Sequence, residues 1–331
     1  MSVKNVSLKV IASQMKVSIN TVSHSLRDLD DISEPLKQRI RKKAIELGYM
    51  PNHVAQKMRK DEKPLIAILI DSFVNLYFNT FSSALTKLFR EKNEYDFLFI
   101  CADRLTVDVV KQCVLQRVDL VVTHFHPEEG VYEFAKLNNI QIVLISTKDK
   151  FGKMDSVGVD ERGGCRAAAK YLADGSDGGY IFVGVDCFCA RMRYSLFRRA
   201  LKDMGVAGEI VFFNTDKKDM PALLNMIEKG LRKIFFYSDG EAYTVLAKLD
   251  ELTGGVRERF PDLKFIGFDG LYKYVYGLQR IVTVQIDYPE FAETVYQVIK
   301  DRLENPNGYA KQLVVPVALP EGQTPPSPQT P

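Results

Sequence analysis

The spacing of apolar residues changes at about residue 64. Before that point they recur every three or four positions, which places them on one face of a helix. After it, short apolar runs alternate with amphipathic stretches, as strands alternate with helices in α/β proteins. The sequence therefore predicts a small all-α head followed by an α/β body.

Three short helices are predicted in the head, each begun by a serine that can cap the first turn. Their expected extents are Leu8–Met15 after Ser7, Ser18–Leu26, and Ser33–Leu47. Apolar residues line one face of the first and third helices: Leu8, Ile11, Ala12, Met15, Leu36, Ile40, Ala44 and Leu47. Pro51 blocks a direct continuation of the third helix. Asn52 can then cap a fourth short helix over 53–60.

Nine apolar runs predict the strands of the body, four in a first series and five in a second. They are Leu65–Ile70, Phe97–Cys101, Leu120–Val122 and Ile140–Ile145, then Tyr180–Val185, Ile210–Phe213, Ile234–Tyr237, Phe265–Phe268 and Ile281–Val284. Amphipathic stretches such as Phe81–Arg90 and Gly163–Leu172 separate them. Strands joined by helices form right-handed βαβ units, so each series predicts one lobe with a parallel sheet.

The composition fits a soluble globular protein of two or three domains, with 331 residues, 46% hydrophobic and 26% charged. No apolar run reaches the about 18 residues of a membrane span. The N-terminus lacks a basic-then-apolar secretion signal. We therefore expect a cytoplasmic protein with no membrane partner.

Cysteine and histidine give little sign of a metal site. The five cysteines are odd in number and irregularly spaced, which fits a reducing compartment better than a disulfide framework. Cys187 and Cys189 form one close pair without a neighbouring His, a weak metal signal. His124 and His126 could face one side of an extended segment, although a structural role is favoured. We expect no metal and no cofactor.

The positive charge is concentrated in the head. Residues 1–60 hold 12 Lys/Arg and 5 Asp/Glu, whereas the remaining residues hold 33 and 37. A basic head on a slightly acidic body indicates that the head meets a polyanion, for which DNA is the natural candidate.

The second predicted helix suits base reading. In a helix-turn-helix, the N-terminal residues of the second helix meet base edges in the major groove. Asn20 could bond adenine, Ile19 could contact a thymine methyl, and His24 could donate to a base or phosphate. The candidate DNA-binding residues of this helix are Ser18, Ile19, Asn20, Thr21, Ser23 and His24. The alternative is a surface helix of an unrelated bundle.

Several motifs together resemble the lactose-repressor (LacI/GalR) family of bacterial regulators. In the head they are Ser18-x-x-Thr21-Val22-Ser23 and Leu47-Gly48-Tyr49-x-Pro51-Asn52-x-Val54-Ala55. In the body they are Val157-Gly158-Val159-Asp160, Arg193 to Phe197, and Gly267-Phe268-Asp269. The match is dense over 7–58 and looser over 65–318.

The resemblance implies that the segment after Pro51 is a hinge helix that folds when two subunits pair on DNA. Its DNA-contacting residues would be Asn52, Val54, Ala55 and Met58. Met58 stands where the family wedges an apolar side chain into a base step, which kinks the duplex. The chain departs from the family at Lys16, where a turn glycine is common, and at His24, where arginine is frequent.

The resemblance also implies a two-lobed body like that of periplasmic sugar-binding proteins, with an effector in the cleft. The effector-binding candidates are Asn75, Tyr77, Phe78, Asp160, Arg193, Ser238 and Asp269. Alternatives remain open: a core-filling aromatic pair at Tyr77 and Phe78, a helix cap at Asp160, a surface ion pair at Arg193, and Arg191 as the binding arginine. A sugar or sugar derivative is favoured over a nucleobase or other metabolite.

These interpretations divide the chain into four parts. They are the helix-turn-helix domain at 1–51, the hinge and linker at 52–64, the effector-binding and dimerisation domain at 65–320, and a disordered tail at 321–331. The lobes are expected at about 65–160 plus 287–310, and at 161–286 plus 311–320.

No phosphate-cradling, metalloprotease or nucleophile-elbow motif occurs. No catalytic residue is therefore assigned, and we do not expect an enzyme. The expected function is that of a ligand-responsive, sequence-specific transcription regulator, with a repressor favoured over an activator. It is expected to be nucleoid-associated and to bind pseudo-palindromic operator DNA as a homodimer. A solute-binding protein would need export, and a sugar-modifying enzyme would need catalytic groups that the sequence does not show.

Overall fold

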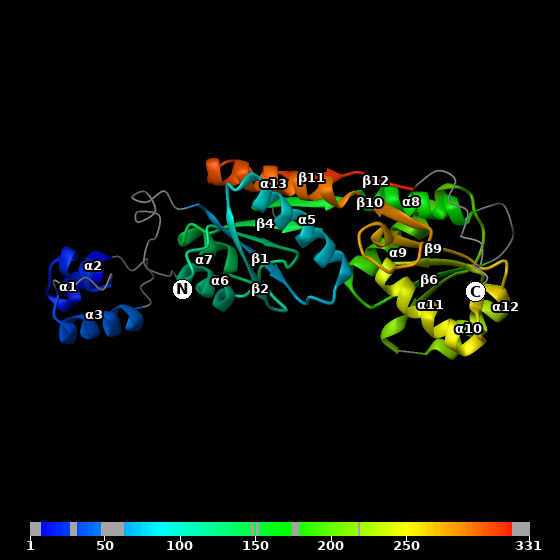
Figure 1. Cartoon of the computed structure of the whole chain (residues 1–331), viewed down its shortest axis with the longest axis horizontal. Coiled ribbons are helices and arrows are strands. Elements are labelled where there is room, and N and C mark those ends of the chain that lie inside the picture. Colours follow the sequence, from blue (N-terminus) through cyan, green and yellow to red (C-terminus); the bar gives the residue numbers. More distant parts are fainter. Residues whose placement is uncertain are drawn as a thin grey trace. The chain divides into compact units, whose positions relative to one another are not determined.

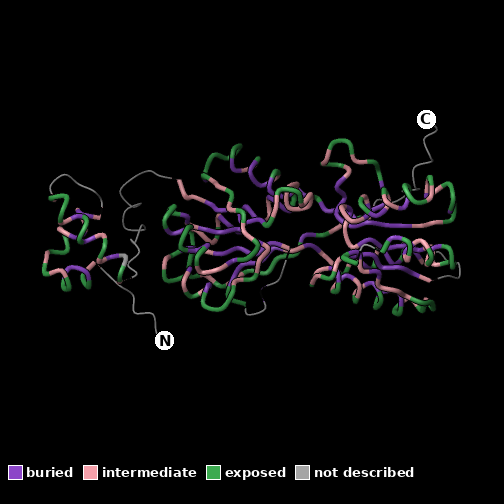
Figure 2. Tube along the Cα trace, turned by 90° about the horizontal axis from the view of Figure 1, so that it is seen from below, coloured by how far each residue is buried: buried purple, intermediate pink, exposed green. Residues whose placement is uncertain are grey.

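A computed structural model describes residues 8–26, 32–47, 63–146, 149, 152–173, 179–217 and 219–319 (Figure 1). The chain divides into two compact units, Met1–Leu69 with Glu94–Ile142, and Ile70–Asn93 with Val143–Pro331. In Figure 2 the buried residues concentrate on the strands and on one side of each long helix. Within these described ranges, no helix has both the length and the apolarity to cross a membrane.

The head contains three helices around a small apolar core. They are α1 Leu8–Met15, α2 Ile19–Leu26 and α3 Glu34–Glu46. The core joins Ile11, Ala12, Val22, Ile40 and Ala44, with Leu8, Met15, Val17, Leu26, Leu36 and Leu47 packed against it. The predicted inner faces of the first and third helices are thereby confirmed. The fourth predicted helix lies outside the described residues.

The turn between α1 and α2 contains a strained residue. Lys16 has a φ of 55°, in the left-handed region where a Cβ meets the backbone and glycine does not. This is the position at which the resemblance to the lactose-repressor family implies a turn glycine. The amide of Val17 still closes the turn by donating to the carbonyl of Ala12 at 3.1 Å.

Lys16→Gly is therefore expected to stabilise the head by about 1 kcal/mol, because it relieves the left-handed strain. Hydrogen exchange of the head amides in the full chain measures this. Lys9→Gly, at an exposed position inside α1, is the matched control and should destabilise the head by about 1 kcal/mol. An equal loss for both variants would mean that the turn carries no strain.

The first sheet of the body has the strand order β11-β5-β4-β3-β1-β2. Its strands are β1 Leu65–Ile70, β2 Asp96–Cys101, β3 Leu120–Thr123, β4 Gln141–Ile145, β5 Asp155–Val159 and β11 Gln312–Val315. The pairs β1–β3, β4–β5 and β5–β11 are parallel. The predicted parallel sheet is thus present.

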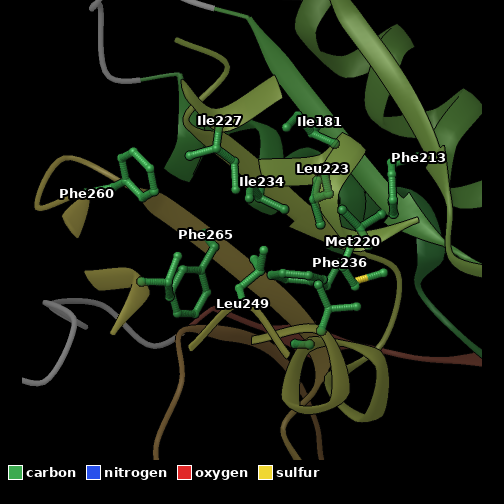
Figure 3. Close-up of a cluster of buried hydrophobic side chains, with 14 of the residues drawn as sticks. Ile181, Phe213, Met220, Leu223, Ile227, Ile234, Phe236, Leu249, Phe260 and Phe265 are labelled. Carbon is green, nitrogen blue, oxygen red and sulfur yellow. The ribbon is translucent and has the colours of Figure 1, made fainter. Parts of the chain in front are cut away.

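The second sheet has the order β12-β10-β9-β8-β6-β7. Its strands are β6 Tyr180–Gly184, β7 Ile210–Asn214, β8 Lys233–Phe236, β9 Lys264–Asp269, β10 Thr283–Ile286 and β12 Val317–Ala318. Every pair is parallel except β10–β12. Figure 3 shows the core on one face of this sheet, where Leu223 and Leu249 meet Ile234 and Phe236.

Helices connect the strands in both series. They are α5 Leu76–Lys92, α6 Val107–Leu115, α7 Val131–Leu137, α8 Glu161–Leu172, α9 Phe188–Asp203, α10 Met220–Glu228, α11 Asp239–Thr253, α12 Val256–Arg259 and α13 Tyr288–Glu304, with short 3-10 turns at Thr215–Lys217 and Leu271–Lys273. Aromatic contacts join α5 to α13, with the Phe81 and Phe291 ring centroids 4.8 Å apart.

The last strands correct one predicted boundary. The sequence placed 311–320 wholly with the second lobe, but β11 pairs with β5 in the first sheet and only β12 joins the second. Arg302 explains the placement of β11. Its guanidinium binds the buried Asp155 carboxylate through Nε at 2.6 Å and Nη2 at 2.9 Å, and it also donates to the carbonyls of Gly308 and Tyr309. The loop before β11 is thereby held beside β5.

Candidate functional site

Helix α2 has one buried and one exposed face. Val22 is fully buried in the head core, whereas Ile19 is 46% exposed and Asn20 is exposed beside it. Ser18 caps the helix, because its Oγ accepts from the Thr21 amide at 2.9 Å. An exposed isoleucine next to an exposed amide is a chemical combination that contacts thymine methyls and adenine edges.

The other predicted readers of α2 occupy its flanks. Thr21, Ser23 and His24 are half-buried, and the Thr21 hydroxyl bonds to Ser18 at 2.8 Å. The base-reading role of the whole set stays a prediction. The hinge candidates Asn52, Val54, Ala55 and Met58 lie outside the described residues.

In the body, Arg193 is the centre of a buried polar cluster. Its side chain comes from α9 and is only 5% exposed. Glu161, at the start of α8, accepts from Nε at 2.7 Å and from Nη2 at 2.9 Å. Nη1 donates to the Tyr237 carbonyl and lies 3.7 Å from the Asp269 carboxylate. The guanidinium also stacks on the Phe268 ring, at 3.6 Å from its centroid.

Asp269 is the last residue of β9 and has a φ of 124°. Residues other than glycine rarely adopt this backbone conformation. Its carboxyl is buried. Burial raises the pKa of Asp269 well above the ordinary value, Arg193 opposes that shift, and the neighbouring Asp239 adds to it. The carboxyl is held next to a cation yet resists ionisation.

Asp239 is fully buried at the start of α11. Its Oδ1 accepts from the Thr283 hydroxyl at 2.6 Å and its Oδ2 from the Leu271 amide at 2.9 Å. Burial raises the pKa of Asp239 to about 7, while these two hydrogen bonds act in the opposite direction. A side chain at Gly267 would collide with the Asp239 carboxyl, so glycine is required there.

Three tyrosines meet beside these charges. The Tyr288 ring centroid is 5.8 Å from that of Tyr77 and 5.0 Å from that of Tyr274, both in edge contacts. The Tyr77 hydroxyl bonds to the Ser146 hydroxyl. Tyr288 is fully buried and its hydroxyl has no hydrogen-bond partner among the described residues.

The predicted body residues therefore fall into two groups. Arg193 and Asp269 come together, with 3.7 Å between Nη1 and the carboxylate, and both charges act on the pKa of the Tyr77 hydroxyl. The others serve helix ends. Asp160 caps α8 by accepting from Gly163 at 2.9 Å, Ser238 caps α11 by accepting from Glu241 at 3.2 Å, and Asn75 occupies the N-cap of α5. The helix-cap alternative for Asp160 is the geometry observed.

Phe78 lies next to the cluster through an edge contact with Tyr77, at 5.0 Å between centroids. Unlike the buried Arg193, Arg191 is exposed, and it forms an ion pair with Asp186. The Cys187 and Cys189 thiols are free. Burial raises the pKa of Cys189 to about 12, so it is an un-ionised thiol at neutral pH.

Sequence reasoning missed Glu161 and Tyr288, and from the pair Ser238-Asp239 it took only Ser238 as a candidate. Glu161 directly follows Asp160, and an acid in the first turn of a helix reads as dipole stabilisation. Asp239 follows the capping Ser238, and it too is explained by stabilisation of the helix dipole. Tyr288 belongs to an apolar face of α13. No local signal distinguishes these residues from ordinary helix residues, because their partners lie far away in the sequence.

Comparison with known proteins identifies regulators that resemble this chain. Residues 7–52 match the family model for bacterial regulatory proteins of the lacI family. The helical head is thus similar to the DNA-binding segment of lacI-family regulators. The transcriptional regulator RegA of Clostridium saccharobutylicum is 25% identical over 211 residues, which are 60% of this chain and 62% of RegA. The chain thus matches about six-tenths of the length of that curated relative.

Solved structures of the lacI family share the fold. The lac repressor dimer bound to operator and the anti-inducer ONPF has a TM-score of 0.64 at 16% identity, covering 96% of this chain and 98% of the repressor. A LacI-family regulator from Enterococcus faecium with bound ribose has a TM-score of 0.65 at 17% identity, covering 78% and 97%. The predicted fold class, a helical head with a parallel-sheet body of the periplasmic-binding type, is confirmed.

Proposed function

We propose that this protein is a sequence-specific, ligand-responsive transcription repressor that binds a pseudo-palindromic operator as a homodimer. The observation that carries the proposal is α2. It buries Val22 in the head core and exposes Ile19 and Asn20, in a segment that matches the family of bacterial regulators. A dimer with two such heads reads two half-sites.

The body supplies the sensor in this proposal. The residues of the buried cluster around Arg193 lie at or just after the carboxyl ends of strands. Asp269 ends β9, Glu161 begins the helix after β5, and Asp239 begins the helix after β8. Ligands of open parallel sheets bind at such ends. Ribose in the regulator from E. faecium supports a sugar or sugar derivative as the effector. Effector binding would change the equilibrium between DNA-binding and non-binding states.

Selection of binding sites from random duplexes, followed by footprinting with the full-length protein, tests the proposal. We expect one protected site with two inverted halves. Affinity should fall steeply with salt, because Lys and Arg release counterions from DNA. Absence of any enriched inverted repeat, or an affinity independent of salt, would contradict the proposal.

Asn20→Ala is expected to relax base preference at one position of each half-site by about 1–3 kcal/mol, since a bidentate amide contact discriminates an adenine to that extent. Competition binding with operator variants measures the change position by position. Lys87→Ala, an exposed change on α5 of the body, should leave every preference intact. Uniform weakening on all sequences would instead make Asn20 a contact to the DNA backbone.

A further inference from the structure

We infer that the effector carries a positively charged amine on a hydroxylated frame, and that Glu161 excludes acidic analogues from the site. The inference rests on the proposed function, because it assigns a ligand class to the same cluster. It follows from three features of the described residues: an excess of carboxyl groups, an arginine whose Nε and Nη2 edge already binds a carboxylate, and a buried hydroxyl without a partner.

The first feature is the balance of charge. Glu161, Asp239 and Asp269 place three carboxyls in the cluster, and Arg193 is the cation that acts most strongly on both aspartates. Asp239 and Asp269 are each at most 2% exposed. Buried carboxyls in excess of cations are costly unless a further positive charge or proton compensates them. Burial raises the pKa of both aspartates, so protons compensate them in part without a ligand, and a ligand amine would take the place of those protons.

The second feature is the occupation of Arg193. An effector carboxylate or phosphate would ordinarily take the two-pronged edge of a guanidinium. Here the Glu161 carboxylate already binds Nε and Nη2, at 2.7 and 2.9 Å. The remaining nitrogen donates to the Tyr237 carbonyl. An acidic ligand would have to displace Glu161 and would then meet a site with surplus negative charge.

The third feature points to a ligand independently of the carboxyls. The Tyr288 hydroxyl is fully buried without a hydrogen-bond partner, an arrangement that native proteins rarely leave unfilled. The charge that acts most strongly on this hydroxyl is that of Asp269, so the two groups lie near each other. Aromatic rings beside a carboxylate attract ammonium groups through cation–π contacts. Tyr77 and Tyr274 complete such a set and extend it toward solvent, since Tyr274 is 39% exposed.

Three hexoses that differ only at carbon 6 test the ligand class: 6-amino-6-deoxyglucose, glucose and glucuronate. Glucosamine serves as a second amine with its charge at carbon 2. Calorimetric titration of the full-length protein at pH 7 should give at least one amino sugar an affinity about tenfold above glucose, and glucuronate the weakest binding. N-acetylation of that amine should abolish the preference. Equal affinities, a preference for glucuronate, or no binding by any of these sugars would overturn the inference.

Variants test the residues. Glu161→Gln should raise the affinity for glucuronate relative to the amino sugar by about tenfold, because it frees the guanidinium of a competing charge. Asp269→Asn should remove the preference for the amine. Glu91→Gln removes one carboxylate from an exposed pair with Lys87 and should leave the order of the sugars unchanged. An unchanged order in Glu161→Gln would show that this residue does not set the specificity.

DNA binding separates the two claims. Operator affinity is measured without sugar for the same protein samples. If the operator is bound but the amine preference is absent, the ligand class is wrong and the regulatory function stands. If no operator is bound under any condition, the proposed function itself fails, whatever the sugars do.

Discussion

Arg193→Met is expected to lower the free energy of unfolding by about 3–5 kcal/mol, the cost of removing one partner from a buried ion pair. The side chain of Arg193 is 5% exposed, and its loss would leave the Glu161 and Asp269 carboxyls without their cation. The loss of stacking on Phe268 adds to this cost. Urea unfolding of the full chain at pH 7 measures the change.

Arg191→Met is the matched control, since it changes the same residue type two positions earlier on the same helix. Arg191 also binds a carboxylate through two nitrogens, but this pair with Asp186 is exposed. Water and salt screen such a pair, so its removal should change stability little. Adding Glu161→Met to Arg193→Met should restore part of the lost free energy of unfolding, because the double variant has no unpaired Glu161 carboxylate in the core. Similar losses for both single variants would contradict the burial of the Arg193 cluster.

The strands of the body could be predicted because most of them are nearly uniform apolar runs. Leu65–Ile70 coincides with β1, and the other eight predicted runs fall within two residues of β2, β3, β4, β6, β7, β8, β9 and β10. Buried parallel strands are apolar on both faces and stand out in a sequence. The inner faces of the head helices were equally visible, because helical periodicity marks them.

β11 and β12 were missed for a physical reason. The apolar run in β11, Leu313–Val315, is short and is followed by Pro316, and three of the four residues of the strand are exposed. Its position depends on Arg302, which binds Asp155 from 147 positions away in the chain. Such long-range ion pairs leave no periodic signal in the sequence, and the predicted course of 311–320 was therefore wrong.

The site could be predicted only in part. Tyr77, Arg193 and Asp269 were named from motifs, and the structure brings them together. What the motifs could not show is that Glu161, 32 positions before Arg193, occupies its guanidinium. The pattern identified which residues belong to the cluster, whereas their hydrogen-bond partners, which decide the ligand class, depend on tertiary contacts.

Asp239→Asn is expected to gain stability relative to the wild type as the pH rises from about 5 to about 8. The folded pKa of Asp239 is raised from 3.8 to about 7, mainly by burial. A raised pKa means that the stability contributed by this group is fully present below the unfolded pKa. It is lost as the pH rises through the folded pKa, by at most about 1.4 kcal/mol per pH unit.

Asparagine is a suitable substitute because it imitates the protonated carboxyl. Its Nδ2 can donate to the Thr283 hydroxyl, which in turn can donate to the Val284 carbonyl at 3.1 Å, and its Oδ1 can keep the Leu271 amide. Other titrating groups are common to both proteins, so the difference between their urea-unfolding free energies isolates Asp239. Two curves that stay parallel between pH 5 and 8 would show that this carboxyl does not titrate there. A difference of the opposite sign would mean that the folded state prefers the charged form. With the expected sign, part of the excess negative charge in the cluster is already neutralised by a proton at neutral pH.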